Sequence, residues 1–161
     1  MGVGKSTIGK RLANKLKVNF LDVDRIIELN EKNSIQEIFQ NKGEPYFRKI
    51  EKKTTLEILN QKNSIIALGG GALTNKSIRK EVIKSTICIW LDVSTKNLLL
   101  RLKNIKKRPL LNQENLQDTI NKIYSDRKKI YNKSHFKIKC DLLNVDQIIE
   151  KIIKINANSR N

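Results

Sequence analysis

The sequence predicts an α/β domain in which helices cover both faces of a parallel β-sheet. Segments with apolar residues every three or four positions alternate with short apolar runs, a pattern typical of helices alternating with strands. The chain has 161 residues, with 39% hydrophobic and 30% charged, which suits one globular domain. It contains only two prolines and no low-complexity linker. We therefore expect a single domain over residues 1–161.

The elements of the first half of the chain follow from periodicity and capping residues. Residues 6–17 have helical spacing of apolar side chains, residues 18–23 are expected to form a strand, and residues 45–59 are again helical. Ser34 and Glu37 have the spacing of a capping box at the start of a helix. Residues 64–68 form a short apolar strand that three glycines follow at once.

The second half continues the same alternation. We expect helices at residues 75–84, 94–103 and 116–131, and strands at residues 86–91 and 136–140. Residues 104–115 form a polar, basic loop. Asn144 is expected to cap a last helix, and the apolar face of this helix is Val145, Ile148, Ile149, Ile152 and Ile153. Four strands are therefore predicted, and the chain order indicates that they are parallel.

Charge and composition restrict the classes of partner. The net charge is +17 and the isoelectric point is about 10, but the lysines are spread along the whole chain. Aromatic residues are only 5% and do not alternate with basic ones, so we expect no nucleic-acid partner. No apolar run reaches the length of a membrane span and no signal peptide is recognisable, so we expect a cytoplasmic protein without a membrane partner. Cys88 and Cys140 lie in apolar or alternating runs and are interpreted as reduced thiols.

The first residues, MGVGKST, match most of the phosphate-binding pattern G-x-x-x-x-G-K-[ST]. Gly4, Lys5 and Ser6 occupy their positions, whereas the first glycine would fall two positions before Met1. Backbone amides of such a loop and the N-terminus of the following helix bind phosphates. In this pattern Lys5 would reach the β- and γ-phosphates and the Ser6 hydroxyl would bind Mg²⁺.

Two carboxylates follow in the stretch FLDVD. Asp22 and Asp24 are interpreted as the C-terminal end of a strand, where a spacing of two places both side chains on one face. Ligands of open α/β sheets bind at the carboxyl ends of strands. A carboxylate near Mg²⁺ and another near an acceptor hydroxyl are what a phosphoryl transferase requires.

Two further segments indicate the same chemistry. The glycines of LGGGA, at positions 69–71, allow a ligand to lie against bare backbone. The basic stretch KNIKKRPLL carries Arg108 and suits a lid that brings an arginine onto a transferring phosphate.

Together these motifs resemble the shikimate kinase family. The matching stretches are GVGKST, FLDVD, GEPYFRKIE, LGGGA, RPLL and DRKKIY, and the resemblance covers essentially the whole chain. It implies a P-loop fold of the nucleoside-monophosphate-kinase type, with three layers and a central parallel sheet in the strand order 2-3-1-4-5. It also implies transfer of the γ-phosphoryl group of MgATP to the 3-hydroxyl of shikimate. Because the central strand precedes the phosphate loop in this family, we expect it to be missing here. We also expect the chain to be less stable without it.

The resemblance assigns roles to residues by matching position. Phosphate and nucleotide contacts would come from Gly2, Val3, Gly4, Lys5, Ser6, Thr7, Arg101 and Arg108. Shikimate contacts would come from Asp24, Arg48, Glu51, Gly69, Gly70, Gly71 and Arg127. Lys5, Asp24 and Arg108 would be catalytic, with Asp24 as the candidate base. Ser6 would bind Mg²⁺ directly, and Asp22 would bind it through water.

The resemblance is incomplete at two points, and alternatives remain. His135 occupies a position where the family usually has alanine, and the segment around residues 142–144 does not match well enough to name an adenine contact. The alternatives are another small-molecule kinase of this fold, such as a gluconate kinase, and a nucleotide-binding homologue without catalysis. The pair Arg48 and Arg127 favours a substrate with a ring carboxylate. We expect the protein to be a monomer, as the family implies.

Overall fold

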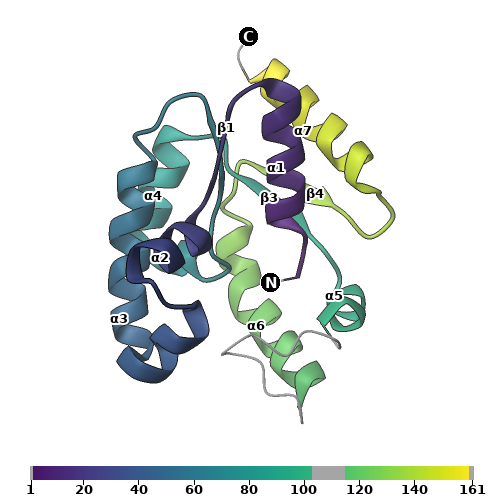
Figure 1. The fold of residues 1–161 in the computed structure, drawn as a ribbon. Coiled ribbons are helices and arrows are strands. Elements are labelled where there is room, and N and C mark those ends of the chain that lie inside the picture. The colour runs from purple at the N-terminus through teal and green to yellow at the C-terminus, as the bar shows by residue number, and fades with distance from the viewer. Residues whose placement is uncertain (1, 103–114, 160–161) are drawn as a thin grey trace.

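The structure is a computed structural model, and it describes residues 2–102 and 115–159. In the first half, helices alternate with two strands (Figure 1). The elements are α1 (Lys5–Leu16), β1 (Asn19–Asp22), α2 (Val23–Glu31), α3 (Ile35–Ile58) and β2 (Ser64–Ala67). Helix α2 was not predicted as a separate element, and α3 begins before the predicted helix at residues 45–59.

The second half begins with the 3₁₀ turn η1 (Ala72–Thr74). It continues through α4 (Lys76–Ser85), β3 (Ile89–Asp92), α5 (Thr95–Leu102), α6 (Leu116–Tyr131), β4 (Phe136–Lys139) and α7 (Val145–Asn158). Strand β3 begins later than predicted, because the backbone N–H of Thr86 still donates to Val82 at the end of α4. The predicted lid at residues 104–115 lies outside the described residues except for Asn115.

Helix starts are determined by the capping residues that the sequence contains. Ser34 and Glu37 form a complete capping box on α3, and Asn144 and Gln147 form another on α7. Helix α3 is interrupted at Gly43, whose φ of 78° and ψ of 168° are not helical. The kink separates the capped first turns of α3 from the part that carries Arg48 and Glu51.

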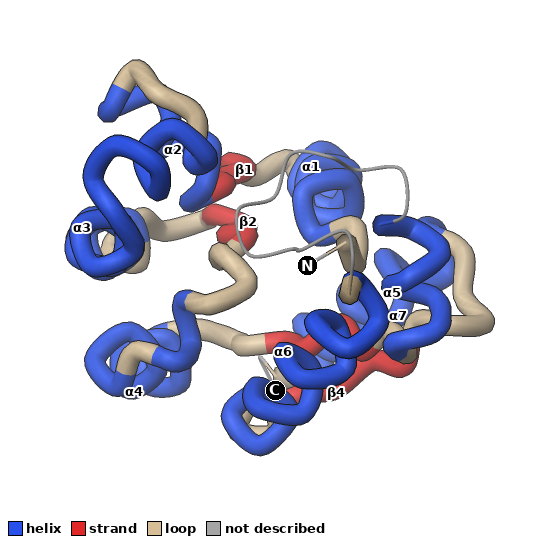
Figure 2. The backbone as a smooth tube through the Cα atoms, turned by 90° about the horizontal axis from the view of Figure 1, so that it is seen from below, coloured by secondary structure: helices blue, strands red, loops and turns tan. Residues whose placement is uncertain are grey.

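The strands form two separate parallel pairs instead of one continuous sheet. Strand β1 pairs with β2 from Asn19 opposite Ser64 to Asp22 opposite Ala67, and β3 pairs with β4 from Ile89 opposite Phe136. These pairings agree with the expected order, in which the second strand neighbours the third and the fourth neighbours the fifth. Figure 2 shows β1 and β2 apart from β4. Within the described residues, no strand lies between β2 and β3.

A cavity of about 680 Å³ lies between the two pairs. Its walls include β2 and the first three residues of β3, together with apolar side chains of α1, such as Ile8 and Leu12. Most of the lining is apolar, as expected for space between strands and helices of the core. We therefore assign most of the cavity volume to the gap between the two strand pairs, and not to a ligand site. At one end it reaches Lys5, Gly70 and Arg127.

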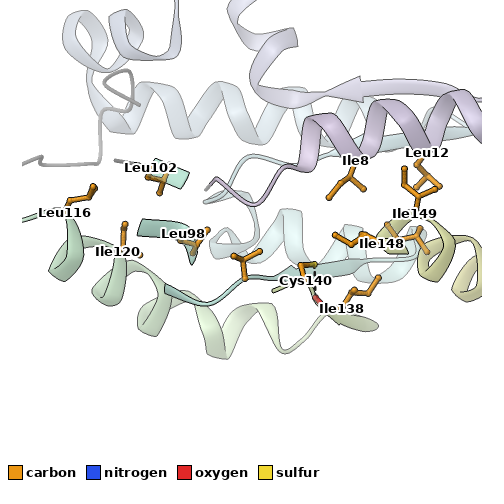
Figure 3. Close-up of a cluster of buried hydrophobic side chains, with 12 residues drawn as sticks. Ile8, Leu12, Leu98, Leu102, Leu116, Ile120, Ile138, Cys140, Ile148 and Ile149 are labelled. Carbon is orange, nitrogen blue, oxygen red and sulfur yellow. Dashed lines mark hydrogen bonds between the residues drawn. The ribbon is translucent and has the colours of Figure 1, made fainter. Parts of the chain in front are cut away.

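Helices lie on both sides of the strands, with α3 and α4 on one side and α1 and α7 on the other (Figure 1). The larger apolar cluster joins α1, α5, α6, β4 and α7, and it includes Ile8, Leu102, Ile120 and Ile148 (Figure 3). A second cluster joins α2 and α3, and a third lies around η1 and α4. Among the described residues, no helix combines the length and apolar character needed to cross a membrane.

Both cysteines are free thiols in the structure. Cys88 precedes β3 and Cys140 follows β4, and both side chains are buried. Burial raises the pKa of both thiols, and that of Cys140 rises to about 11. His135 accepts a hydrogen bond at Nδ1 from the backbone N–H of Cys88, at 3.0 Å, so it joins the end of α6 to the start of β3.

Candidate active site

The phosphate loop leads directly into α1. Gly4 is the residue before the helix, and its φ of 86° is a left-handed conformation that glycine adopts without a Cβ clash. No side chain caps this helix start, and its first turn contains no acidic residue. The arrangement therefore leaves a helix N-terminus of positive partial charge beside Lys5, as an anion site requires.

Ser6 and Asp22 lie together beside this loop. The Ser6 hydroxyl donates to Asp22 Oδ2 at 2.5 Å, although the two residues come from α1 and from the end of β1. Asp22 also accepts from the backbone N–H of Arg25 at 3.5 Å and so begins α2. A hydroxyl and a carboxylate are oxygen ligands of the kind that Mg²⁺ takes in addition to phosphate oxygens and water. In the described part of the chain, no group of three or more histidine, cysteine, aspartate or glutamate side chains could hold a metal ion.

Asp24 lies on a helix, so the expectation that it shares a strand face with Asp22 is wrong. Strand β1 ends at Asp22, and Asp24 is in the first turn of α2. The strand ends early because the Asp22 side chain caps the helix. Asp24 nevertheless points to the predicted site, because its carboxylate lies close to Gly69 beyond the end of β2.

The segment at residues 69–71, the glycine segment, is in close contact with charged side chains. A Cβ added at Gly69 would lie 2.5 Å from Glu51 Oε1 and 2.9 Å from Asp24 Oδ1. A Cβ added at Gly71 would lie 2.5 Å from Arg48 Nη1. Any larger residue at positions 69 or 71 would displace these groups, which explains the glycines at these two positions. It also means that Asp24, Glu51 and Arg48 converge on the glycine segment.

Arg48 is held by two carboxylates of its own helix. Its Nη1 donates to Glu51 Oε2 at 2.8 Å, and its Nε and Nη2 donate to Glu44 Oε1 at 3.0 and 2.9 Å. A guanidinium has five N–H groups, so the three bonds within the described residues leave two donors for a ligand. Sequence reasoning missed Glu44, although its position four residues before Arg48 is a spacing that allows an ion pair on a helix.

Glu51 is a buried carboxylate with an unusual environment. Its side chain is 2% exposed, and Oε1 has no hydrogen-bond partner within the described residues. Burial raises the pKa of Glu51, and the neighbouring Asp24 carboxylate adds to the rise, whereas Arg48 and Arg127 lower it. Negative charge on Glu51 is therefore costly in the absence of a ligand, and the ion pair with Arg48 offsets part of this cost.

A second arginine reaches the glycine segment from α6. Arg127 Nη1 donates to the carbonyl oxygen of Gly70 at 2.8 Å, and the Tyr131 hydroxyl donates to the same oxygen. Tyr131 is the last residue of the matching stretch DRKKIY, but the sequence alone assigned it no role. Its spacing of four from Arg127 is the signal, since residues four apart lie on one face of a helix.

The remaining predicted contacts are more scattered. Arg101 is exposed in the last turn of α5. Burial opposes ionisation of Asp141, in the loop after β4, but hydrogen bonds from Ser94 and Asn97 lower the pKa of its carboxyl, and the charge of Arg101 adds to this. The backbone N–H and hydroxyl of Ser94 also donate to Asp141, which ties this loop to the start of α5. Gly2, Val3 and Thr7 lie in or directly after the loop before α1. Arg108 lies outside the described residues.

Fold and site together define a class of protein. The site combines a phosphate loop at the start of a helix, a hydroxyl–carboxylate pair beside it, and carboxylates and arginines of α2, α3 and α6 that meet at the glycine segment after β2. These are the parts of a phosphotransferase that acts on a small acceptor. The predicted α/β fold with parallel strands is confirmed, although it contains two strand pairs.

Comparison with known proteins identifies the family. The family model for shikimate kinase matches residues 1–156. The chain belongs to the shikimate kinase family, and the resemblance noted in the sequence is confirmed.

Individual relatives agree with this. The chain is 40% identical over 153 residues to the shikimate kinase of Sulfurihydrogenibium sp., which covers 95% of this chain and 91% of the relative. It is 37% identical to that of Bacillus subtilis, over 96% of this chain and 83% of the relative. Its fold is similar to that of Acinetobacter baumannii shikimate kinase in complex with shikimate, with a TM-score of 0.94 and 31% identity over 99% of this chain and 89% of that one.

Proposed function

We propose that this chain is an ATP-dependent kinase that transfers the γ-phosphoryl group to the 3-hydroxyl of shikimate, giving shikimate 3-phosphate and ADP. The observation that carries the proposal is the convergence of Asp24, Glu51, Arg48 and Arg127 on the glycine segment. This arrangement offers cationic donors for a carboxylate and an acidic group for a hydroxyl. An acceptor that is a polyhydroxy acid requires both the cationic donors and the acidic group.

The acceptor would lie against the glycine segment between the two arginines. Arg48 retains two N–H donors beyond its bonds to Glu44 and Glu51, and Arg127 uses only Nη1 on Gly70 among the hydrogen bonds described above. Guanidinium groups bind carboxylates through paired, charge-assisted hydrogen bonds. Asp24 would then accept the proton of the attacking hydroxyl and orient it toward the phosphate loop.

ATP would bind with its phosphates on the loop before α1. The backbone amides there and the positive end of α1 suit the phosphates, and Lys5 lines the same end of the cavity. The hydroxyl of Ser6 and the carboxylate of Asp22 would hold Mg²⁺, which the resemblance assigns to Ser6 directly and to Asp22 through water. The ion, when bound, would neutralise charge on the phosphate oxygens. Arg108 would contribute from the predicted lid, a role that rests on the family resemblance alone.

Gluconate is the alternative acceptor to be excluded. Gluconate also carries a carboxylate, so the pair Arg48 and Arg127 does not by itself separate gluconate from shikimate. The relative from Acinetobacter baumannii, which was solved with shikimate, favours shikimate. We also propose a cytoplasmic monomer without nucleic-acid partners, in keeping with the composition of the chain.

The test is a coupled assay of ADP release with MgATP and either shikimate or gluconate. We expect turnover with shikimate and little above background with gluconate. Equal or faster turnover with gluconate would refute the assignment. Nucleotide binding without turnover of either acceptor would instead support the homologue without catalysis. Omission of Mg²⁺ should abolish turnover, and gel filtration with light scattering would determine the oligomeric state.

A further inference from the structure

The carbonyl oxygen of Gly70 accepts two hydrogen bonds from one helix. Arg127 Nη1 donates to it at 2.8 Å and the Tyr131 hydroxyl donates as well, and both residues belong to α6. A carbonyl oxygen has two lone pairs, so these two donors satisfy it. Because Gly70 follows β2 whereas α6 precedes β4, this contact also joins the two strand pairs at the end where the site lies.

The Tyr131 ring is fixed independently of its hydroxyl. Its centroid lies 5.7 Å from that of Trp90 on β3, at an interplanar angle of 54°. Aromatic pairs of this tilted kind are favourable. The ring packing therefore holds the hydroxyl in position and would survive removal of the oxygen atom alone.

The bond from Tyr131 restricts two groups that face the acceptor. Arg127 donates to the same carbonyl oxygen of Gly70. By holding this oxygen in place, the Tyr131 hydroxyl also fixes the position of the acceptor to which Arg127 binds. It also fixes the plane of the peptide that joins Gly70 to Gly71, because the peptide is planar and trans. With the carbonyl oxygen directed at α6, the N–H of Gly71 is directed away from it.

We propose that Tyr131 is a positioning residue for acceptor binding. Its hydroxyl holds the Gly70 carbonyl so that the glycine segment and Arg127 are arranged for the carboxylate and ring of the acceptor before the acceptor arrives. This inference rests on the proposed function, since it concerns the affinity for shikimate. It assigns no chemical step to Tyr131, which acts through Gly70 and Arg127.

The experiment compares Tyr131→Phe with Tyr124→Phe. Tyr124 is a matched control because it is on the same helix, also packs against Trp90, and donates its hydroxyl to Asp92 Oδ1 at 2.9 Å instead of to Gly70. Each variant loses one hydroxyl and keeps its ring. A general loss of stability would therefore affect both, and thermal melts would reveal it.

For Tyr131→Phe we expect the KM for shikimate to rise about 3- to 10-fold, as for the loss of one hydrogen bond, with kcat and the KM for ATP within about twofold of wild type. Tyr124→Phe should leave the KM for shikimate unchanged. Shikimate titrations followed by the fluorescence of Trp90, the single tryptophan, measure the same affinity without turnover. The apparent Kd should rise in parallel with KM.

The outcomes distinguish this proposal from the proposed function. Wild-type turnover of shikimate combined with an unchanged KM and Kd in Tyr131→Phe would overturn the positioning role alone. Equal increases in both variants would also overturn it, because they would indicate a structural effect. A wild-type chain that neither binds nor phosphorylates shikimate would refute the proposed function and this inference with it.

Discussion

Arg48 and Glu51 form an ion pair one helical turn apart, with 2.8 Å between Nη1 and Oε2, and the Glu51 side chain is only 2% exposed. The pair is asymmetric, because Arg48 remains partly accessible whereas Glu51 lies beneath the glycine segment. The buried carboxylate thus fixes the direction of a guanidinium that faces the site. Glu51 therefore supports ligand binding by orienting Arg48, whereas the burial of its carboxylate lowers the stability of the fold.

Glu51→Gln should weaken shikimate binding and change the pH dependence of stability. We expect a rise in the shikimate KM of about tenfold, because the ion pair between Arg48 and Glu51 becomes a hydrogen bond from Arg48 to a neutral amide oxygen. The pKa of Glu51 is raised in the folded state above its ordinary value of 4.5. The folded chain therefore holds this proton more tightly than the unfolded chain, and wild-type stability should fall, relative to the variant, as pH rises above 4.5. Urea denaturation at several pH values measures this, and a difference that grew with pH in favour of wild type would contradict it.

Asp24→Asn should reduce kcat far more than shikimate affinity. Asparagine keeps the shape of the side chain but cannot take a proton, and general-base and orienting roles contribute about 10²- to 10⁴-fold. The control is Asp146→Asn, whose side chain is 80% exposed on α7. Steady-state kinetics with both substrates would decide. A loss of kcat of less than about threefold would leave Asp24 with a binding role only.

Two glycine substitutions should separate an effect on shikimate binding from an effect on stability. In Gly71→Ala the added Cβ meets the Arg48 guanidinium at 2.5 Å, the end of a flexible side chain that can move. We expect a higher KM for shikimate with a nearly unchanged melting temperature. In Gly9→Ala the Cβ would lie 2.5 Å from Cε2 of the Phe20 ring, where α1 packs on β1, so the melting temperature should fall. Similar melting temperatures for both variants would count against this reading of the contacts.

The cavity between β2 and β3 should accept one further strand. An N-terminal extension of five or six apolar residues, joined to the phosphate loop by a glycine-containing turn, would bring backbone partners to both strand edges and bury apolar side chains worth about 1.5–3 kcal/mol each. We expect a higher melting temperature, and tighter nucleotide binding because the loop before α1 would gain a fixed entry. Thermal melts with and without MgATP compare the two chains. A polar extension of the same length is the control, and equal stabilisation by both extensions would show that the apolar residues do not fill the cavity.

Much of the fold could be predicted because local signals and packing agree. The capping residues Ser34 and Asn144 begin helices where expected, and residues 116–131 form one helix as the apolar spacing indicated. Helix α2 was missed because Asp22 both ends a strand and caps a helix, a double role that a pattern of alternation does not reveal. The predicted strand pairs are present, but a single sheet is not.

The structure brings Arg48, Glu51, Asp24 and the glycines together, whereas the roles that the resemblance implies for them stay predictions. Their contacts depend on tertiary packing, which the sequence pattern does not contain. Glu44 and Tyr131 were given no role because their function is to hold another residue, and such a role depends on distances in space. Arg108 stays a prediction.

The separate apolar clusters also bear on how cooperatively the chain unfolds. One cluster is built on α2 and α3 and another on α1, α5, α6, β4 and α7. Arg48 lies on α3, in the first group of elements, and Arg127 lies on α6, in the second. Units with separate cores open with separate free energies, which amide hydrogen exchange resolves. A ligand held by both arginines would bind only when both units are closed, and it would therefore make their opening concerted. Binding of the substrate would then couple the opening of the two units. Amide hydrogen exchange in α3 and in α6 would slow together when shikimate is added.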